Sequence, residues 1–399
     1  MTAINVVSEK LPAITLQKRQ EKRILFGHPW VYSNEVHMEA SAKNIAPGSV
    51  VRVLAADGQL LGIAHFNPHT LIAARMLNRY VETVDVAFWA KRLSAALAMR
   101  EQLFDKPYYR LVHAEADLCP GLIIDRYGDV IVMQANTAGM NAARDAIVAA
   151  LDELIKPKTI LLRGDNPSRV LERLPEEVVL LKGTAPAGLD VFENGLTYCA
   201  DIMGGQKTGW FYDQRANRAM VAKFAKGRTM LDLYTHTGGF GLCAAHAGAA
   251  SVLCVDRSEH SLALAEQAAK KQNLSQVLFE KEEVFEFCEK RGKSKRYEIV
   301  VADPPAFAKS KKDVSAASRG YRKLAKHCAD MTERGGFLFI ASCSHAITRE
   351  RFDEEVLRGI ADAKRGARIL SRTAADMDHP THPQLPESAY LKGILCYVD

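Results

Sequence analysis

The sequence predicts an α/β protein in which a small β-barrel and a small α+β domain precede a larger domain with a largely parallel sheet. Residues 1–80 contain short β-like runs separated by turn signals, whereas residues 84–182 mix helical and strand patterns. After residue 190, apolar strands alternate with helical intervals, the pattern of a parallel sheet covered by helices on both faces. We therefore expect three domains, at residues 1–80, 84–182 and 190–399.

The composition is that of an ordinary globular protein. The 399 residues are 48% apolar and 25% charged, enough apolar content for two or three packed domains. No apolar stretch approaches the length of a membrane-spanning helix, and residues 1–10 lack the basic start and apolar core of a secretion signal. We expect a cytoplasmic protein without a membrane partner. The net charge of +6 is compatible with a polyanionic partner.

Cysteine and histidine are not spaced as the ligands of a metal site are. The eight cysteines are scattered without a Cys-x-x-Cys pair, and the twelve histidines include no His-Glu-x-x-His arrangement. We therefore expect reduced thiols, no disulfide framework and no bound metal.

Residues 1–80 are expected to form the β-barrel. Three β-like runs, separated by Pro-Gly, Asp-Gly and Asn-Pro turn signals, lie at residues 49–54, 60–64 and 71–77. The basic segment at residues 18–32 has aromatic residues close behind its charges. This mixture suits phosphate contacts with stacking, or equally a solvated charge beside a buried tryptophan.

Residues 84–182 are expected to form the α+β domain, followed by a linker at residues 181–188 that is rich in small and turn residues. The pattern predicts helices at residues 88–104 and 141–154 and strands at residues 121–125 and 129–134. Five buried strands are predicted in the third domain, at residues 229–234, 251–256, 276–279, 299–303 and 336–341.

A glycine-rich turn follows the first strand of the third domain. Residues 231–241 have the pattern of strand, turn and helix, in which glycine lets the backbone approach a ligand and the helix start offers N–H donors. Gly239-x-Gly241-x-x-Ala244 also matches the dinucleotide fingerprint, and Asp256 closes the next strand as a ribose-binding acid would. An NAD-dependent oxidoreductase and an S-adenosylmethionine-dependent methyltransferase both fit these two strands.

Two further strand ends separate these alternatives. Asp303-Pro304-Pro305 ends one strand, and its prolines lack N–H groups, so that carbonyl groups and the carboxylate face a planar, amide-like base. Cys343 follows another strand, within Ser342-Cys343-Ser344. Because the carboxyl ends of parallel strands meet at one edge of a sheet, we expect Asp303 and Cys343 in one pocket. A lone cysteine is otherwise a small buried hydrophobe.

Taken together, these motifs resemble those of the bacterial 23S ribosomal RNA cytosine-5 methyltransferases that carry an N-terminal PUA domain. The resemblance spans nearly the whole chain and includes residues 27–31, 207–215 and 390–393. It implies a Rossmann-like class I methyltransferase domain with a mixed seven-stranded sheet, preceded by a PUA-like β-barrel. It also implies S-adenosylmethionine as cofactor and 23S ribosomal RNA as partner, and it is compatible with a homodimer.

The resemblance implies a set of cofactor-binding residues. Residues 207–215 would close over the cofactor, the glycine turn would hold its methionine end, Asp256 its ribose and Glu283 its adenine amino group. The full set is Lys207, Thr208, Gly209, Tyr212, Asp213, Gln214, Arg215, Asp232, Tyr234, Thr237, Gly238, Gly239, Asp256, Glu283, Asp303 and Pro304. Two positions depart from the family: Glu283 stands where aspartate is usual, and Ala306 where lysine is usual.

Cys343 and Asp303 are the implied catalytic residues. Carbon 5 of cytosine is a poor nucleophile, and addition of a thiolate at carbon 6 converts the ring into an enamine-like species that can attack the methyl group. A free thiol, with a pKa of about 8.5, is mostly protonated at neutral pH, so Cys343 must be activated or lose its proton as it attacks. Asp303 would hold the amino group and N3 edge of the base. His345 is one candidate for the base that removes the C5 proton.

Residues 306–326 carry seven basic side chains against one acid. We expect phosphate contacts on either side of the target base from Lys309, Lys311, Lys312, Arg319, Arg322 and Lys323, with a solvated helix face as the alternative. The target base has to be flipped out of folded RNA, and the PUA-like domain would provide a second RNA contact. The alternatives for the whole chain are a guanine or uracil RNA methyltransferase and a non-catalytic RNA-binding protein.

Overall fold

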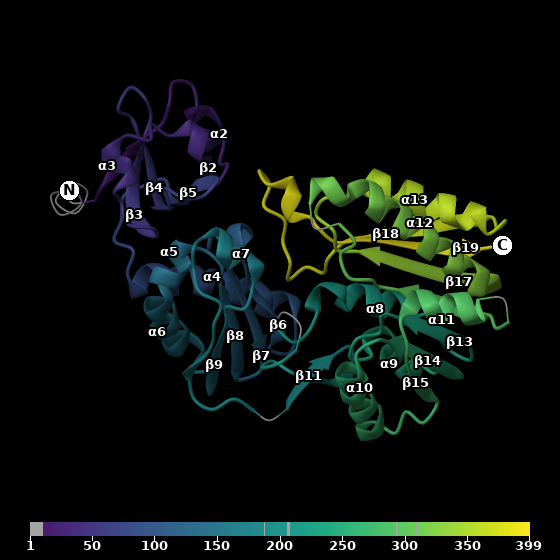
Figure 1. Ribbon diagram of the computed structural model, residues 1–399. Helices are drawn as coiled ribbons and strands as arrows, with labels where there is room; N and C mark the ends of the chain where they lie inside the picture. Colours follow the sequence, from purple (N-terminus) through teal and green to yellow (C-terminus); the bar gives the residue numbers. More distant parts are fainter. Residues whose placement is uncertain (1–10, 187, 206–207, 293, 309) are drawn as a thin grey trace. The chain divides into compact units, whose positions relative to one another are not determined.

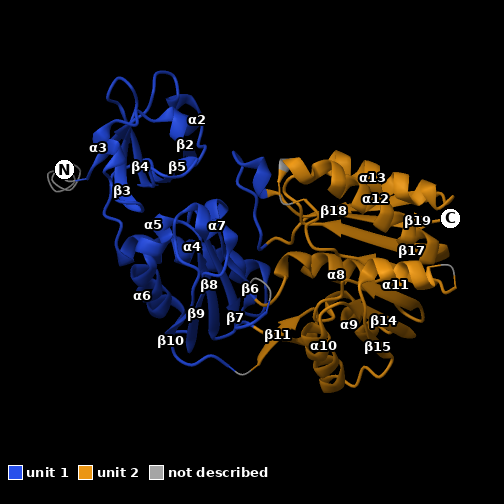
Figure 2. Ribbon diagram, viewed as in Figure 1, with its two compact units in different colours: residues 1–187, 202–208, 378–388 blue, residues 188–201, 209–377, 389–399 orange. Residues whose placement is uncertain are grey.

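The computed structural model describes residues 11–186, 188–205, 208–292, 294–308 and 310–399 (Figure 1). The chain divides into two compact units (Figure 2). Unit 1 consists of residues 1–187, 202–208 and 378–388, and unit 2 consists of residues 188–201, 209–377 and 389–399. Each unit thus combines segments that are far apart in the sequence.

The first sheet of unit 1 has five strands in the order β1-β3-β4-β5-β2. The three predicted runs are its strands β3 (Ser49–Leu54), β4 (Leu60–Phe66) and β5 (Ile72–Asn78). Its other elements are β1 (Ala13–Thr15), β2 (Trp30–Tyr32), α2 (Glu21–Leu25) and α3 (Ala40–Lys43). Val51 and Val53 alternate along β3 with partly exposed residues and are fully buried, which is the pattern of a strand with one face on a core.

The second sheet of unit 1 also has five strands, in the order β10-β9-β8-β7-β6. They are β6 (Tyr108–His113), β7 (Leu122–Tyr127), β8 (Val130–Ala135), β9 (Thr159–Arg163) and β10 (Val178–Lys182), with helices α4 (Val86–Leu103), α5 (Ala138–Ala142), α6 (Arg144–Ile155) and α7 (Pro167–Leu171). The predicted helix at residues 141–154 is divided at Ala143. The first two residues of the predicted linker belong to β10.

Unit 2 begins with a hairpin of β11 (Leu189–Glu193) and β12 (Leu196–Ala200). Asn194 and Gly195 form its turn with φ values of 52° and 81°. Positive φ at both central residues is what a tight hairpin turn requires, and Asn-Gly is the pair that adopts it most readily. This hairpin is absent from the sequence-based expectation.

The main sheet of unit 2 has seven strands in the order β15-β14-β13-β16-β17-β19-β18. The five predicted strands are β13 (Thr229–Leu233), β14 (Ser251–Asp256), β15 (Val277–Lys281), β16 (Tyr297–Ala302) and β17 (Thr332–Ser342), and they pair in parallel. The last two, β18 (Ala367–Thr373) and β19 (Lys392–Val398), are antiparallel to their neighbours. The mixed seven-stranded sheet expected from the resemblance is confirmed.

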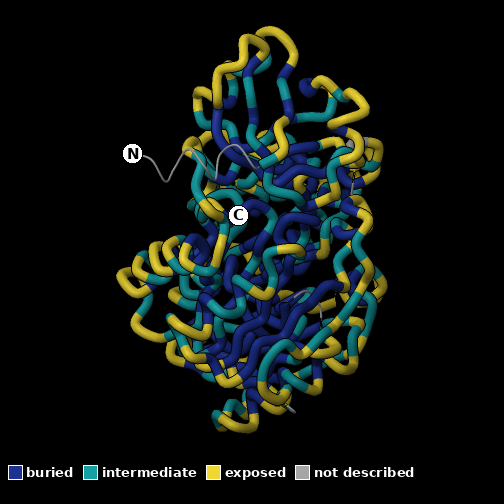
Figure 3. Tube along the Cα trace, turned by 90° about the vertical axis from the view of Figure 1, so that its left-hand side faces the viewer, coloured by how far each residue is buried: buried dark blue, intermediate teal, exposed yellow. Residues whose placement is uncertain are grey.

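Helices cover both faces of this sheet (Figure 1). On one face, α8 (Arg215–Ala222), α9 (Gly239–His246) and α10 (Glu259–Lys271) follow one another in contact. On the other, α11 (Val284–Arg291), α12 (Val314–Met331) and α13 (Arg349–Asp362) pack together over a core that includes Leu324 and Phe352. Figure 3 shows the resulting burial, and β13, β16 and β17 are buried over most of their length.

The order of the strands fixes where a ligand can bind. From β13 the chain proceeds outward through β14 to β15 and then returns to β16, on the other side of β13. The connections from β13 and β16 therefore leave in opposite directions, and open α/β sheets bind ligands at the crevice that this reversal creates. The glycine turn and Asp303 follow these two strands.

No helix in the described part of the chain is long and apolar enough to cross a membrane. Among the same residues, no group of three or more His, Cys, Asp or Glu side chains could hold a metal ion.

Candidate active site

Asp232, near the end of β13, organises the glycine turn. Its Oδ2 accepts hydrogen bonds from the backbone N–H of Gly241 at 2.8 Å and from the hydroxyl of Thr235 at 2.5 Å. In the turn, Tyr234 adopts a φ of 60°, a left-handed conformation that costs an aromatic residue about 1–3 kcal/mol. Such strain is concentrated at ligand sites. The turn therefore has the properties of a binding loop.

Gly241 lets α9 approach the sheet closely, and its replacement by alanine is expected to disrupt the turn. The added Cβ would lie 2.4 Å from the Sγ of Cys254 and 3.2 Å from the Oδ2 of Asp232. Overpacking of this kind costs about 1–3 kcal/mol. We expect Gly241→Ala to lower the melting temperature and to weaken binding of the turn's ligand, measured by thermal unfolding and calorimetry.

Gly188→Ala is the matched control for this substitution, because a Cβ at Gly188 would meet nothing within 4 Å. It should melt and bind as the wild type does. If Gly241→Ala also behaves like the wild type in both measurements, the close approach at Gly241 is not needed for the turn.

Two further carboxylates follow β14 and β15. The Oδ2 of Asp256 accepts the backbone N–H of His236 at 2.9 Å, which ties the end of β14 to the glycine turn. Glu283 caps α11, and its Oε2 accepts two backbone N–H groups at 2.8 and 3.1 Å. Burial raises the pKa of the Tyr234 hydroxyl, and the charges of Glu283 and Asp256 contribute to the rise. Asp256, Glu283 and Tyr234 are therefore close enough to influence one another beside the glycine turn.

The residues before α8 connect to the end of β16. Asp213 accepts a hydrogen bond from the hydroxyl of Tyr390, and both Asp213 and Gln214 are buried. The side chain of Gln214 hydrogen bonds to Asp303 and also accepts from Asn217 at 2.6 Å. The predicted residues Asp213, Gln214 and Asp303 are thus brought together within unit 2.

Asp303 lies in an acidic environment. Burial, and next the negative charge of Asp213, raise the pKa of the Asp303 carboxyl to about 7. Arg218 and the hydrogen bond from Gln214 act in the opposite direction. At neutral pH the carboxyl is therefore present in both protonated and ionised forms, so it can donate as well as accept a proton. Pro304, which follows it, is buried.

Cys343 follows β17, the strand beside β16. It is the one cysteine of the eight that is not buried. In the parallel pairing of the two strands Ala302 lies opposite Ile340, so Asp303 and Cys343 leave neighbouring strand ends at the same edge of the sheet. Adjacent strands are about 4.8 Å apart, so both groups lie at the crevice on this edge of the sheet. His345, two residues further on, is exposed and stacks on Tyr390 with ring centroids 5.2 Å apart.

Comparisons with known proteins identify the family of this chain. A family model described as a PUA-like domain matches residues 14–79. A second model, described as an S-adenosylmethionine-dependent methyltransferase, matches residues 165–395, more than half of the chain. The chain belongs to this methyltransferase family. Its fold class, its enzyme class and its cofactor, S-adenosylmethionine, are those that the resemblance implied.

Curated relatives align with the methyltransferase over nearly its full length. The ribosomal RNA large subunit methyltransferase I of Tolumonas auensis is 37% identical over 391 residues, 96% of this chain and 98% of the relative. The protein of the same name from Shewanella frigidimarina is 36% identical over 393 residues, 96% of this chain and 99% of the relative. Among solved structures, SMU.776 in complex with SAH has a TM-score of 0.83 at 23% identity, over 97% of this chain and all of that one. This likeness shows a shared fold.

At the glycine turn, one carboxylate oxygen of Asp232 is available to accept a hydrogen bond from the cofactor. The Oδ1 of Asp232 is buried and has no hydrogen-bond partner among the described residues. Burial raises the pKa of this carboxyl to about 7, and a cation beside it would favour the ionised form. The methionine end of S-adenosylmethionine carries an ammonium group, so the residues present fit the cofactor. The predicted cofactor roles of the individual side chains stay predictions.

The other predicted residues of the turn, Thr237, Gly238 and Gly239, connect β13 to α9. Thr237 is 2% exposed and Gly238 has a φ of 82°, which glycine adopts without strain. Gly239 begins α9, and a Cβ there would lie 2.6 Å from the Nε of Arg218. Gly238 is therefore favoured by its backbone conformation, and Gly239 by the close approach of the Arg218 side chain.

The predicted segment 207–215 spans both units. Lys207 lies outside the described residues. Thr208, in unit 1, donates its hydroxyl to the Oδ2 of Asp125 at 2.5 Å, and its carbonyl oxygen accepts from the hydroxyl of Tyr127 at 3.0 Å. The side chain of Thr208 is thus engaged within unit 1. Gly209 and the residues after it belong to unit 2.

A buried ion-pair cluster that the sequence did not reveal supports this segment. Arg218 donates to the Oε1 of Glu193 at 2.7 Å and lies over the ring of Trp210, whose Nε1 donates to the Oε2 of Glu193 at 2.9 Å. Arg215 lies 3.7 Å from the same carboxylate and 3.3 Å from Asp376. Glu193 is on the β11–β12 hairpin, so the Asn-Gly turn signal of that hairpin could have indicated it.

The predicted basic segment lies largely on a helix. Arg319, Arg322 and Lys323 are on α12, where Arg322 pairs with Asp362 at 2.6 Å and Lys323 with Glu289 at 2.8 Å. Lys312 and Arg319 are exposed. Lys309 lies outside the described residues, as does the side chain of Lys311. Part of the excess positive charge is therefore neutralised by acids from other elements.

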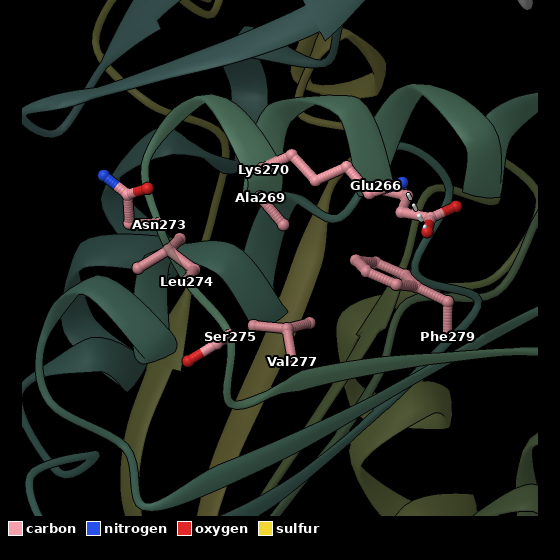
Figure 4. A pocket seen from close by; sticks show the side chains of 8 residues that line it. All are labelled: Glu266, Ala269, Lys270, Asn273, Leu274, Ser275, Val277 and Phe279. Atoms are coloured by element: carbon pink, nitrogen blue, oxygen red, sulfur yellow. Dashed lines mark ion pairs between the residues drawn. The ribbon is translucent and has the colours of Figure 1, made fainter.

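A separate cavity of about 450 Å³ lies between α10 and the edge strand β15 (Figure 4). Its lining comes from the end of α10, the connection and β15: Glu266, Ala269, Lys270, Asn273, Leu274, Ser275, Val277 and Phe279. None of the predicted site residues lines it.

Proposed function

We propose that this methyltransferase places a methyl group on carbon 5 of a cytosine in RNA, with 23S ribosomal RNA as the substrate. The observation that carries the proposal is the position of Cys343, partly exposed at a strand end next to that of Asp303. Methylation of an exocyclic or ring nitrogen needs no thiol at this place. The names of the curated relatives support ribosomal RNA as the substrate class.

Cys343 has the central chemical role in this proposal. Its thiolate adds to carbon 6, which forms an S–C6 bond and moves the electrons of the C5–C6 double bond to carbon 5 and, through carbon 4, to N3, which takes up a proton. Bound S-adenosylmethionine would supply an electrophilic methyl group to carbon 5 and leave as its thioether, while N3 returns its proton. A base then removes the C5 proton, the C5–C6 double bond forms again, and the thiolate leaves. Cys343 returns to its starting state.

Asp303 would bind the edge of the base that carries the amino group and N3. With a pKa raised to about 7, its protonated form can donate a proton to N3 as negative charge develops in the ring during thiolate addition. The hydrogen bond from Gln214 would orient the carboxyl. This assigns Asp303 the role of an acid in the addition step.

RNA contacts would come from two regions. Lys312 and Arg319 are exposed basic residues of the segment after Asp303 and would contact phosphates beside the target base. The PUA-like residues 14–79 would provide the second contact.

A ribosomal RNA substrate implies action in the cytoplasm. The domain boundaries 1–80, 84–182 and 190–399, and a homodimer, stay predictions.

The proposal is tested by incubating the protein with labelled S-adenosylmethionine and ribosomal RNA from a strain that lacks the gene. We expect the label on carbon 5 of a cytosine in 23S RNA when digested fragments are mapped by mass spectrometry. A label on guanine or uracil would replace the proposed substrate base. An absence of label from all RNA would favour a protein that only binds RNA.

A further inference from the structure

Lys392 reaches across the end of β17 beside Cys343. It is the first residue of β19 and lies opposite Ser342 in the antiparallel pairing of β17 and β19. Its Nζ donates a hydrogen bond to the carbonyl oxygen of Ser344 at 2.7 Å. The lysine therefore links the residues immediately before and after Cys343.

Burial of the Lys392 ammonium group costs free energy, so compensating interactions are expected. The residue is 4% exposed, and an ammonium group taken out of water is stable only with good partners. Burial, and next the positive charge of Arg349 at the start of α13, lower the pKa of Lys392 to about 8. Cys343 is the group that acts in the opposite direction. An anion at Cys343 would thus be the natural charge partner of this lysine.

The loop around Cys343 is held on its other side by α12. The hydroxyl of Ser342 donates to the hydroxyl of Tyr321 at 2.7 Å, and the hydroxyls of Tyr321 and Ser344 are 3.2 Å apart. The backbone N–H of Ala308 donates to the hydroxyl of Ser344 at 3.3 Å. Both neighbours of Cys343 are therefore fixed, Ser342 and Ser344 by Tyr321, and Ser344 also by Lys392.

We propose that Lys392 is a positioning residue for Cys343: it fixes the loop through the carbonyl of Ser344, and its ammonium group favours the thiolate form of the cysteine. The inference rests on the proposed role of Cys343 as nucleophile. The thiol proton passes to water and the S–H electron pair stays on sulfur, where Lys392 balances the negative charge. When the thiolate is expelled after methyl transfer, the same ion pair forms again.

The test is the pH dependence of alkylation of Cys343 by iodoacetamide, which needs neither RNA nor cofactor. The thiolate is the reacting form, and Cys343 is the one cysteine that is not buried. We expect Lys392→Met to shift the pH of half-maximal alkylation upward by about one unit, which lowers the rate at pH 7 by about tenfold. Lys392→Arg should restore most of the rate, because it keeps the charge.

Controls separate a charge effect from a change of fold. Lys271→Met removes an exposed lysine that pairs with Asp190 and should leave the alkylation profile unchanged. Cys343→Ala should remove the labelled peptide. Among the described residues, the other charged or titratable groups around the site are Asp303 after β16, Tyr321 on α12, Arg349 on α13, His345 in the loop and Tyr390, which stacks on His345. They are retained in Lys392→Met, so a shift of the profile reports the lysine alone.

A Lys392→Met variant that alkylates as the wild type does at every pH would overturn the inference. The inference would also be overturned if Cys343 is alkylated equally slowly in Lys392→Arg and Lys392→Met. The reactivity of the thiol would then depend on the shape of the side chain at position 392 and not on its charge. Neither outcome bears on the proposed methylation. That proposal fails separately, if Cys343→Ala still methylates cytosine.

Discussion

Replacement of Cys343 by alanine is expected to abolish methyl transfer to RNA and to leave cofactor binding unchanged. The substitution removes the group that adds to carbon 6, and no other described cysteine is exposed enough to replace it. Loss of a covalent nucleophile typically lowers kcat by at least ~10⁴-fold. Transfer of labelled methyl groups to ribosomal RNA measures the rate, and calorimetry with S-adenosylmethionine measures binding.

Cys396→Ala is the matched control. Cys396 is fully buried on β19 and pairs with Leu338 of β17, so its loss affects packing near the site without changing an exposed thiol. It should cost about 1 kcal/mol of stability and keep nearly the wild-type rate. Substantial cytosine methylation by Cys343→Ala would contradict the covalent mechanism.

Asp303→Asn is expected to lower kcat by ~10²–10⁴-fold, the range for loss of a general acid. The pKa of Asp303 is raised to about 7, so the carboxyl is protonated below pH 7 and ionised above it. If the protonated form donates to N3, the wild-type rate falls as the pH rises through 7. The asparagine variant should lack this falling limb, because its amide does not titrate. The measurement is kcat between pH 5.5 and 9 at saturating RNA and cofactor.

Asp330→Asn is the control for this profile, since Asp330 pairs with Lys326 on α12 and faces no part of the site described above. It should retain both the rate and the falling limb. A falling limb that persists in Asp303→Asn would assign the titration to another group.

The sequence predicted those parts of the fold that are determined by short, local sequence patterns. The five parallel strands follow from apolar runs of strand length, and the turn after β13, Asp303 and Cys343 follow from the residues at their ends. Parallel strands align their carboxyl ends, so three separate sequence motifs lie at one edge of the sheet. For this reason the candidate site could be located before any contact was known.

The features that the sequence did not predict depend on contacts between residues that are distant in the chain. The link from Lys392 to Ser344 joins positions 48 residues apart, and no local pattern predicts that a lysine at the start of a strand is buried. The same applies to Arg218, whose partner Glu193 is 25 residues away. The strand β19 itself was not predicted, since residues 390–393 entered only as part of the resemblance, and its place beside β17 comes from pairing between distant residues.

The account as a whole depends on a bond between Cys343 and carbon 6 of cytosine. RNA that carries 5-fluorocytosine tests this bond directly, because carbon 5 then has no proton to lose and the thiolate cannot be expelled after methyl transfer. We expect a stable protein–RNA adduct that requires S-adenosylmethionine and maps by mass spectrometry to Cys343. Failure to form the adduct with RNA whose unmodified form is methylated, or an adduct at another residue, would contradict the account.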